Sequence, residues 1–228
     1  MSPREVVDLC VKRRIPSISY TYNEPSIFSE FFLDTAKLAK ERGIRNILVT
    51  NGYQSEELLE RCRGLIDAMN IDLKSFSEEF YRDLCDGSLE PVLRNIRNAW
   101  GAGIWVEVTT LVIPGRNDSE KELNDIAAFM AGVDPSMPWH ISAFHPCFRM
   151  MDVPRTPFAT LRRAYDIGKM HGIKHVYTGN TPDTDTAATF CATCGKVLIE
   201  RSGFRSEKHY EGAGVCPQCH TKIAGVFV

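Results

Sequence analysis

Short apolar segments with the composition of β-strands alternate with amphipathic helical segments along residues 1–180, and this alternation constrains the fold most strongly. Such a pattern is typical of βα units, whose strands lie parallel in one sheet. Six units follow one another at intervals of roughly 25 to 35 residues, the length of a βαβ repeat. We therefore expect an α/β protein. Its predicted strands are residues 15–20, 46–50, 68–73, 104–113, 139–144 and 174–178.

The composition of the 228-residue chain is that of an ordinary globular protein and excludes disordered, collagen-like and coiled-coil classes. Its 27 Lys and Arg residues against 29 Asp and Glu residues give a formal charge of −2, which offers no case for nucleic acid or an anionic membrane as partner. No apolar run approaches the roughly 20 residues of a membrane helix, and the N-terminus lacks a signal-peptide core. We therefore expect a cytoplasmic protein.

Polar residues follow the predicted strands directly, and in a barrel of parallel strands these positions line the active-site mouth. Asp72 and Lys74 are two residues apart in an apolar strand, so both point to the same side, where a charge pair is costly unless it is paired or used. Glu24, before Pro25, offers a carboxylate that can accept from an ammonium group. Asn51-Gly52 and Asn117-Asp118 taken singly fit turn chemistry equally well, and His145 is a further rim candidate. Together the pattern favours a small-molecule pocket.

Six motifs in order resemble the radical S-adenosylmethionine (radical SAM) superfamily, in the branch of pyruvate formate-lyase activating enzyme-like and AmmeMemoRadiSam-system enzymes. The motifs are SYTYNEPSIF, NILVTNGY, MNIDLKSF, EVTTLVIPGRNDSE, PWHISAFHP and HVYTGN. The resemblance implies a partial (β/α) barrel. It also implies an oxidoreductase that cleaves S-adenosylmethionine reductively at a [4Fe-4S] cluster and abstracts a hydrogen atom, as enzymes that install glycyl radicals do.

The resemblance also assigns cofactor-binding residues. Tyr22-Asn23-Glu24-Pro25 stands where the superfamily has Gly-Gly-Glu-Pro, which receives the amino group of S-adenosylmethionine. Residues 50–52 match its Thr-Asn-Gly, residues 72–74 match its Asp-Leu-Lys near the cofactor, and residues 112–118 correspond to the strand beside the adenine and ribose. No catalytic residue is assigned. The predicted S-adenosylmethionine contacts are Asn23, Glu24, Asn51, Asp72, Lys74, Asn117 and His145.

The superfamily holds its cluster with cysteines spaced Cys-x3-Cys-x2-Cys, and this sequence contains no such spacing. The chain begins where the helix after the family's cluster loop would begin, so the first strand and the cluster loop are expected to be missing together, as in an N-terminal truncation. Cys10, Cys62, Cys85 and Cys147 are too dispersed to replace them. We therefore expect the chain as given to bind no radical-generating cluster and not to cleave S-adenosylmethionine.

Two cysteine pairs, Cys191/Cys194 and Cys216/Cys219, lie in the last 38 residues. Paired Cys-x2-Cys units in a cytosolic chain bind metal more often than they form disulfides, and two such pairs are typical of a tetrathiolate zinc ribbon. We expect Zn²⁺ here in preference to a rubredoxin-type iron, a disulfide pair or an auxiliary iron-sulfur cluster. The predicted organisation is a partial barrel over residues 1–180, a polar linker over 181–190 and a zinc-ribbon-like module over 191–228.

The expected partners are S-adenosylmethionine, a protein substrate and an electron donor of the flavodoxin or ferredoxin type, all implied by the resemblance. Two other functions stay open. One is a non-catalytic protein that binds S-adenosylmethionine or acts as a scaffold after losing the cluster site. The other is a zinc-ribbon adaptor, which predicts a basic, aromatic ribbon surface.

Overall fold

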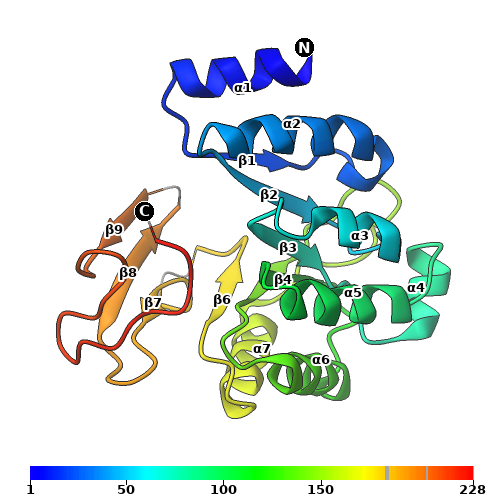
Figure 1. The fold of residues 1–228 in the computed structure, drawn as a ribbon. Coiled ribbons are helices and arrows are strands. Elements are labelled where there is room, and N and C mark those ends of the chain that lie inside the picture. The colour runs from blue at the N-terminus through cyan, green and yellow to red at the C-terminus, as the bar shows by residue number, and fades with distance from the viewer. Residues whose placement is uncertain (183–184, 204, 228) are drawn as a thin grey trace. The chain divides into compact units, whose positions relative to one another are not determined.

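The computed structural model describes residues 1–182, 185–203 and 205–227. Six strands form one sheet in the sequential order β1-β2-β3-β4-β5-β6, and three more form a second sheet in the order β7-β8-β9 (Figure 1). The pairs β1–β2, β2–β3 and β5–β6 are parallel, and each is joined by a crossover that contains a helix, as parallel neighbours usually are. All six predicted strands are present, which confirms the α/β fold of a partial barrel.

The contacts divide the chain into two compact units, residues 1–73 with 87–108 and residues 74–86 with 109–228. The sequence-based boundaries at residues 180 and 190 stay a prediction. Residues 183–184 of the predicted linker, and residues 204 and 228 of the predicted module, lie outside the described residues.

The first unit contains the first three strands and the helices that follow them. A serine N-cap with a capping box and a proline in the first turn starts its first helix. Its elements are α1 (Pro3–Lys12), β1 (Ser17–Tyr20), the 3₁₀-helix η1 (Pro25–Phe28), α2 (Ser29–Glu41), β2 (Arg45–Thr50), α3 (Glu56–Cys62), β3 (Ala68–Asp72), α5 (Glu90–Gly101) and the first half of β4 (Trp105–Val112).

One face of β2 is buried against helix α2, and the other face is more open. Asn46, Leu48 and Thr50 are buried, whereas Val49 on the opposite face is 36% exposed. Asn46 Nδ2 donates to the Ala36 carbonyl of α2 at 2.9 Å and to the Leu65 carbonyl at 3.2 Å, and the Tyr20 hydroxyl donates to Asn46 Oδ1 at 2.9 Å. A buried amide thus joins β1, α2 and the turn before β3.

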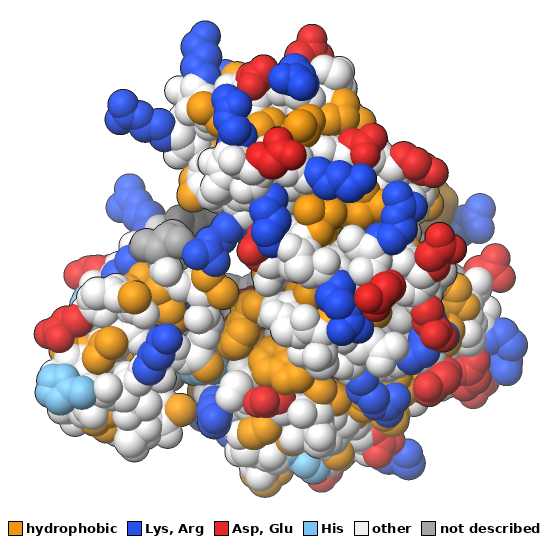
Figure 2. Space-filling model, viewed as in Figure 1, with side chains coloured by type: hydrophobic (Ala, Val, Ile, Leu, Met, Phe, Trp, Pro, Cys, Tyr) orange, Lys and Arg blue, Asp and Glu red, His pale blue; other side chains and the backbone are white. Residues whose placement is uncertain are grey.

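The outer helices of the first unit carry charges of both signs. Figure 2 shows Lys and Arg side chains among Asp and Glu side chains where α1 and α2 lie. Arg42 and Asp8 form one such ion pair, at 3.9 Å, with both side chains about half exposed. Exposed pairs of this kind add little stability, so α1 is held on α2 mainly by the apolar cluster of Val7, Cys10 and Ala39.

The second unit contains the remaining strands of the large sheet and the small sheet. Its core is formed by fully buried side chains such as Leu123, Met130 and Trp139, and Trp139 Nε1 donates to Thr110 Oγ1 at 3.0 Å. Its elements are α4 (Glu78–Leu84), the second half of β4, α6 (Glu120–Val133), β5 (Trp139–Ala143), α7 (Phe158–Met170), β6 (Val176–Gly179), β7 (Thr189–Phe190), β8 (Val197–Ser202) and β9 (Arg205–Lys208).

No helix among the described residues has the length and apolar character needed to cross a bilayer.

The turn after β2 has room only for glycine at residue 52. Gly52 has φ +76°, and a Cβ there would lie 2.7 Å from Ile71 Cγ2 and 3.0 Å from Val92 Cγ1. Gly43 has a similar φ of +71° but nothing within 4 Å of an added Cβ. Gly43→Ala should therefore lose only the roughly 1–2 kcal/mol of the left-handed conformation.

We expect Gly52→Ala to destabilise the protein by about 1–3 kcal/mol more than Gly43→Ala, because its methyl group also clashes with two core side chains. Chemical denaturation of the two variants measures the difference. Equal losses of unfolding free energy would show that the turn is not packed against β3 and α5 as described.

Candidate functional site

The carboxylate of Glu24 is the most strongly organised group among the predicted site residues. Glu24 follows β1 and forms the N-cap of η1. Its Oε1 accepts from the Ser26 amide at 3.1 Å, the Ser26 hydroxyl at 2.7 Å and the Thr50 hydroxyl at 2.7 Å. Its Oε2 accepts from the Asn51 amide at 2.7 Å. The structure thus brings Glu24 and Asn51 together and fixes the carboxylate between the loops that follow β1 and β2.

The segment that follows Thr50 and Asn51 is anchored to α5 by side-chain hydrogen bonds. Asn95, which is 1% exposed, donates through Nδ2 to the carbonyls of Gly52 at 2.9 Å and Gln54 at 2.7 Å. The Asn51 side chain accepts from the Tyr53 amide at 2.9 Å, a local turn that asparagine favours. Because the carbonyls of Gly52 and Gln54 and the amide of Tyr53 have fixed partners, the donors to Glu24 are held in place without a ligand.

Gln54 completes this network and was not singled out from the sequence. Its side chain is buried, at 3% exposure, and Nε2 donates to Thr50 Oγ1 at 2.5 Å. Its Oε1 is buried without a hydrogen-bond partner among the described residues. No sequence motif marks this role, because the contact depends on how the loop folds back onto β2.

In the second unit, the side chain of Asn117 forms hydrogen bonds with backbone groups. It is 1% exposed, its Oδ1 accepts from the Ile113 amide at 2.6 Å, and its Nδ2 donates to the carbonyls of Lys74 at 2.6 Å and Leu111 at 2.9 Å. The Lys74 amide also donates to the Tyr81 hydroxyl at 3.1 Å. Lys74 and Asn117 are thus brought together through the Lys74 carbonyl.

The other predicted contacts lie at strand ends. Asn23 is exposed in the loop after β1, and Asp72 is half-buried as the last residue of β3. His145 is exposed just after β5. Their roles in binding S-adenosylmethionine stay predictions.

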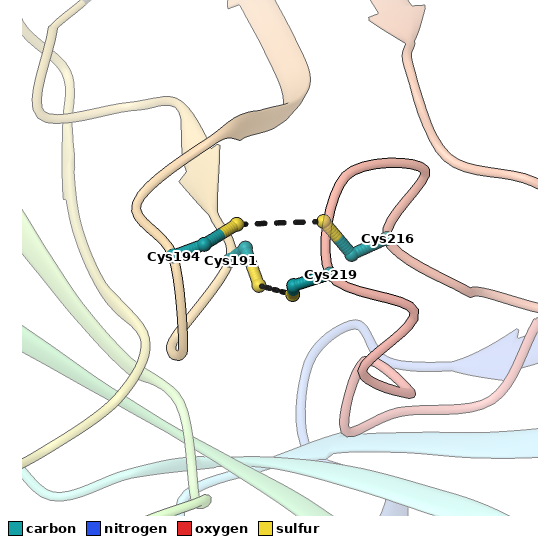
Figure 3. A group of neighbouring side chains, drawn as sticks. All are labelled: Cys191, Cys194, Cys216 and Cys219. Atoms are coloured by element: carbon teal, nitrogen blue, oxygen red, sulfur yellow. Dashed lines mark hydrogen bonds between the residues drawn. The ribbon is translucent and has the colours of Figure 1, made fainter.

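The four tail cysteines converge on one point, as Figure 3 shows. Their four Sγ atoms all lie within 4.8 Å of one another, with Cys191 and Cys219 at 3.5 Å and Cys194 and Cys216 at 3.7 Å. These are not disulfide distances, and all four are free thiols. Tetrahedral zinc with Zn–S bonds of about 2.3 Å would separate its sulfurs by about 3.8 Å, so the residues fit such an ion.

Local hydrogen bonds shape both cysteine turns. The Gly195 amide donates to the Cys191 carbonyl at 2.9 Å, and the His220 amide donates to the Cys216 carbonyl at 2.9 Å. Gly195 and His220 both have positive φ, which closes each turn around its pair of sulfurs. Hydrogen bonds from the side chain and backbone of Thr221 lower the pKa of Cys219, whereas hydrogen bonds with the other three thiols raise the pKa of Cys194.

The cysteine module is attached to β6 by polar and aromatic contacts. Arg201 of β8 donates to the Ala187 carbonyl and to Thr189 Oγ1, both at 2.8 Å. Its guanidinium lies 5.0 Å from the ring centroid of Tyr177 on β6, and the Tyr177 and Thr189 hydroxyls are 3.0 Å apart. The small sheet therefore holds the last strand of the large sheet through one arginine and one tyrosine.

The four remaining cysteines do not form a cluster site. Cys10 and Cys62 are buried, Cys85 is half-buried and Cys147 is exposed. Within the described part of the chain, groups of three or more metal-ligating side chains occur only at the tail cysteines and at Glu200, Glu207 and His209. The residues present therefore do not fit the three-cysteine cluster of the family that the motifs resemble.

Comparison with known proteins gives matches over most of the chain. A family model, that of the radical SAM superfamily, matches residues 1–129. The uncharacterized protein MJ0808 of Methanocaldococcus jannaschii is 41% identical over 208 residues, which cover 91% of this chain and 62% of that protein. The benzylsuccinate synthase activating enzyme of Thauera aromatica is 25% identical over 114 residues, 50% of this chain and 34% of that enzyme. The chain thus spans less than two thirds of either relative.

Among solved structures, a domain of a pyruvate-formate lyase-activating enzyme from Bacteroides vulgatus superposes with a TM-score of 0.63. The match has 22% sequence identity and covers 72% of this chain and 98% of that domain. At this identity the likeness concerns the fold, which agrees with the partial barrel described above.

The cysteines outside the tail differ in burial and should therefore differ in their reactivity toward alkylating reagents. Cys62 is fully buried, and this burial raises the pKa of its thiol to about 12, so little thiolate exists at neutral pH. We expect iodoacetamide to modify exposed Cys147 rapidly at pH 7.5 and Cys62 only after unfolding, as measured by peptide mass spectrometry. Rapid modification of Cys62 in the folded protein would contradict its placement in the core.

Proposed function

Because this chain belongs to the radical SAM superfamily, we propose that it supplies the S-adenosylmethionine-binding part of an enzyme of the glycyl-radical-activating kind. The observation that carries the proposal is the Glu24 carboxylate, held by four donors from two strand-end loops. A fixed, half-buried carboxylate at this position suits the ammonium group of S-adenosylmethionine.

The distribution of donors leaves a place for that ammonium group. Oε1 of Glu24 accepts three hydrogen bonds, whereas Oε2 accepts one, from the Asn51 amide. Oε2 is therefore the less occupied of the two carboxylate oxygens and the one that can accept a further hydrogen bond from a ligand. We place the amino group of S-adenosylmethionine there, and we assign further contacts to Asn23, Asn51 and Asp72 of the same unit. For Lys74, Asn117 and His145 a contact with S-adenosylmethionine stays a prediction of the family resemblance.

The chemistry that we propose for the whole protein rests on its family and relatives. In this superfamily a [4Fe-4S] cluster supplies the electron that cleaves S-adenosylmethionine, and the resulting radical abstracts hydrogen. Relatives with activating-enzyme names, one of them a putative glycyl-radical enzyme activating enzyme, support a glycyl-radical enzyme as the protein substrate. We propose an electron donor of the flavodoxin or ferredoxin type on the family resemblance alone. The residues of this chain do not supply the cluster ligands, so its own part is to bind and orient S-adenosylmethionine.

Calorimetry with S-adenosylmethionine tests the role of Glu24. Glu24→Gln removes the charge and places an amide among donors, so we expect affinity to fall at least about 10-fold, the value of a charged hydrogen bond. Glu41→Gln, which removes an equivalent charge from the exposed end of α2, should bind like wild type. Equal affinity of Glu24→Gln and wild type would reject the assignment.

We also propose that the four tail cysteines hold one structural Zn²⁺. Four thiolates close the coordination shell, so the ion is not available for catalysis. The apolar core of the module consists mainly of Leu198 and Ile223 beside the cysteines, and a core of this size requires support from a metal.

Metal analysis tests this second site. Protein purified under reducing conditions should contain about one zinc per chain, and Cys216→Ser should lose it, because three thiolates and a hydroxyl bind zinc more weakly. Cys147→Ser, at an exposed cysteine outside the group, should keep the metal. Iron without zinc in the wild-type protein would overturn the assignment.

A further inference from the structure

We propose that Gln54 is a positioning residue for the S-adenosylmethionine site and acts on Glu24 through the hydroxyl of Thr50. The inference rests on the proposed function and adds a residue that neither the family resemblance nor the sequence pattern assigns. It follows from the direction of three hydrogen bonds, from the cost of burying Gln54 and from the anchoring of its backbone.

The Thr50 hydroxyl has a single proton, and its contacts determine where that proton goes. The Glu24 carboxylate can only accept, so the proton points to Oε1 at 2.7 Å. The Thr50 oxygen must then act as acceptor in its other contacts, from the Gly52 amide at 3.2 Å and from Gln54 Nε2 at 2.5 Å. This also fixes the amide orientation of Gln54, because its oxygen cannot face an acceptor. Gln54 therefore holds the hydroxyl in the rotamer that donates to Glu24.

Gln54 is a poor choice for stability alone. Its side chain is 97% buried, yet Oε1 has no hydrogen-bond partner within the described part of the chain. A buried, unpaired carbonyl loses its hydration without compensation, and a methionine of similar length would avoid that loss. A residue that lowers stability while it orients a ligand-binding group is expected at a functional site.

The position of Gln54 is fixed from outside the network. Asn95 of α5 binds the Gln54 carbonyl at 2.7 Å, and Ser55, the next residue, is the N-cap of α3. The backbone is thus anchored by two helices, and the side chain turns back to the last residue of β2. A path of three side chains runs from α5 to Glu24 through Asn95, Gln54 and Thr50.

Gln54→Met separates positioning from a purely structural role. We expect its affinity for S-adenosylmethionine to fall about 3- to 10-fold, because one neutral hydrogen bond is lost behind Glu24. The melting temperature should stay unchanged or rise, because the unpaired carbonyl is removed. Leu58→Met, beside it on α3, is the matched control and should keep wild-type affinity. A lower melting temperature with unchanged affinity would overturn the proposal.

A double-mutant cycle tests whether Gln54 acts through Thr50. Thr50→Val should weaken binding by itself, and adding Gln54→Met to it should have no further effect. Independent, additive losses of affinity would contradict the proposed path.

The carbon-13 chemical shift of the Glu24 carboxylate in the ligand-free protein should change in Gln54→Met and not in Leu58→Met. This last readout distinguishes the two proposals: a wild type that does not bind S-adenosylmethionine rejects the proposed function, whereas an unmoved Glu24 signal rejects the role of Gln54.

Gln54→Glu adds a conservative variant with its own pH signature. The introduced carboxyl can donate to Thr50 when protonated but competes for the hydroxyl proton when ionised. Affinity should therefore approach that of wild type at low pH and fall as pH rises. The charged groups nearby are Glu24, reached through Thr50, and Glu57 and Arg61, which line the same pocket as Gln54. These groups are present in wild type and in Gln54→Glu alike, so the dependence of wild-type affinity on pH is the reference. The same dependence of affinity on pH in the two proteins would contradict the proposal.

Discussion

Buried side-chain amides that bind backbone groups are the interaction on which the strand-end loops of this protein depend. Parallel strands end at one edge of a sheet, and the loops that follow cannot satisfy their carbonyls and amides within a ladder. Asn46 joins α2 to the turn before β3, Asn95 joins α5 to the turn after β2, and Asn117 joins the backbone at Lys74 to the backbone at Leu111. Each is almost fully buried and makes at least two such bonds. The loops are consequently held by core residues.

This arrangement explains how exposed loops can present a ligand-binding group in a fixed position. Glu24 receives donors from the loops after β1 and β2, and Asn95 anchors the second of these loops from α5. A ligand that meets donors already in place loses less entropy on binding than one that must order a mobile loop. Asn117 uses its side chain in the same way, because its three hydrogen bonds also go to the backbone.

The sequence predicted the six strands, the position of Glu24 and the two cysteine pairs, because periodicity and spacing are local properties. The chain after β1 forms the 3₁₀-helix η1 first and becomes the α-helix α2 only at Ser29. Helices α3 and α4 were not predicted, since seven residues carry too little periodicity, although Ser55 and Ser77 each cap a helix whose first turn holds two glutamates. The Gln54–Thr50 contact was beyond the sequence, because the direction of a hydrogen bond depends on which groups meet in space.

The small core of the cysteine module has a consequence for how the protein responds to its surroundings. A metal that binds only the folded module stabilises it by mass action, by about 1.4 kcal/mol for each tenfold rise in free metal above the dissociation constant. The apolar cores around α2 and α6 have no such dependence. Arg201 of β8 contacts Tyr177 of β6, so under the proposed zinc assignment the stabilisation of the module extends to a contact with the last strand of the large sheet.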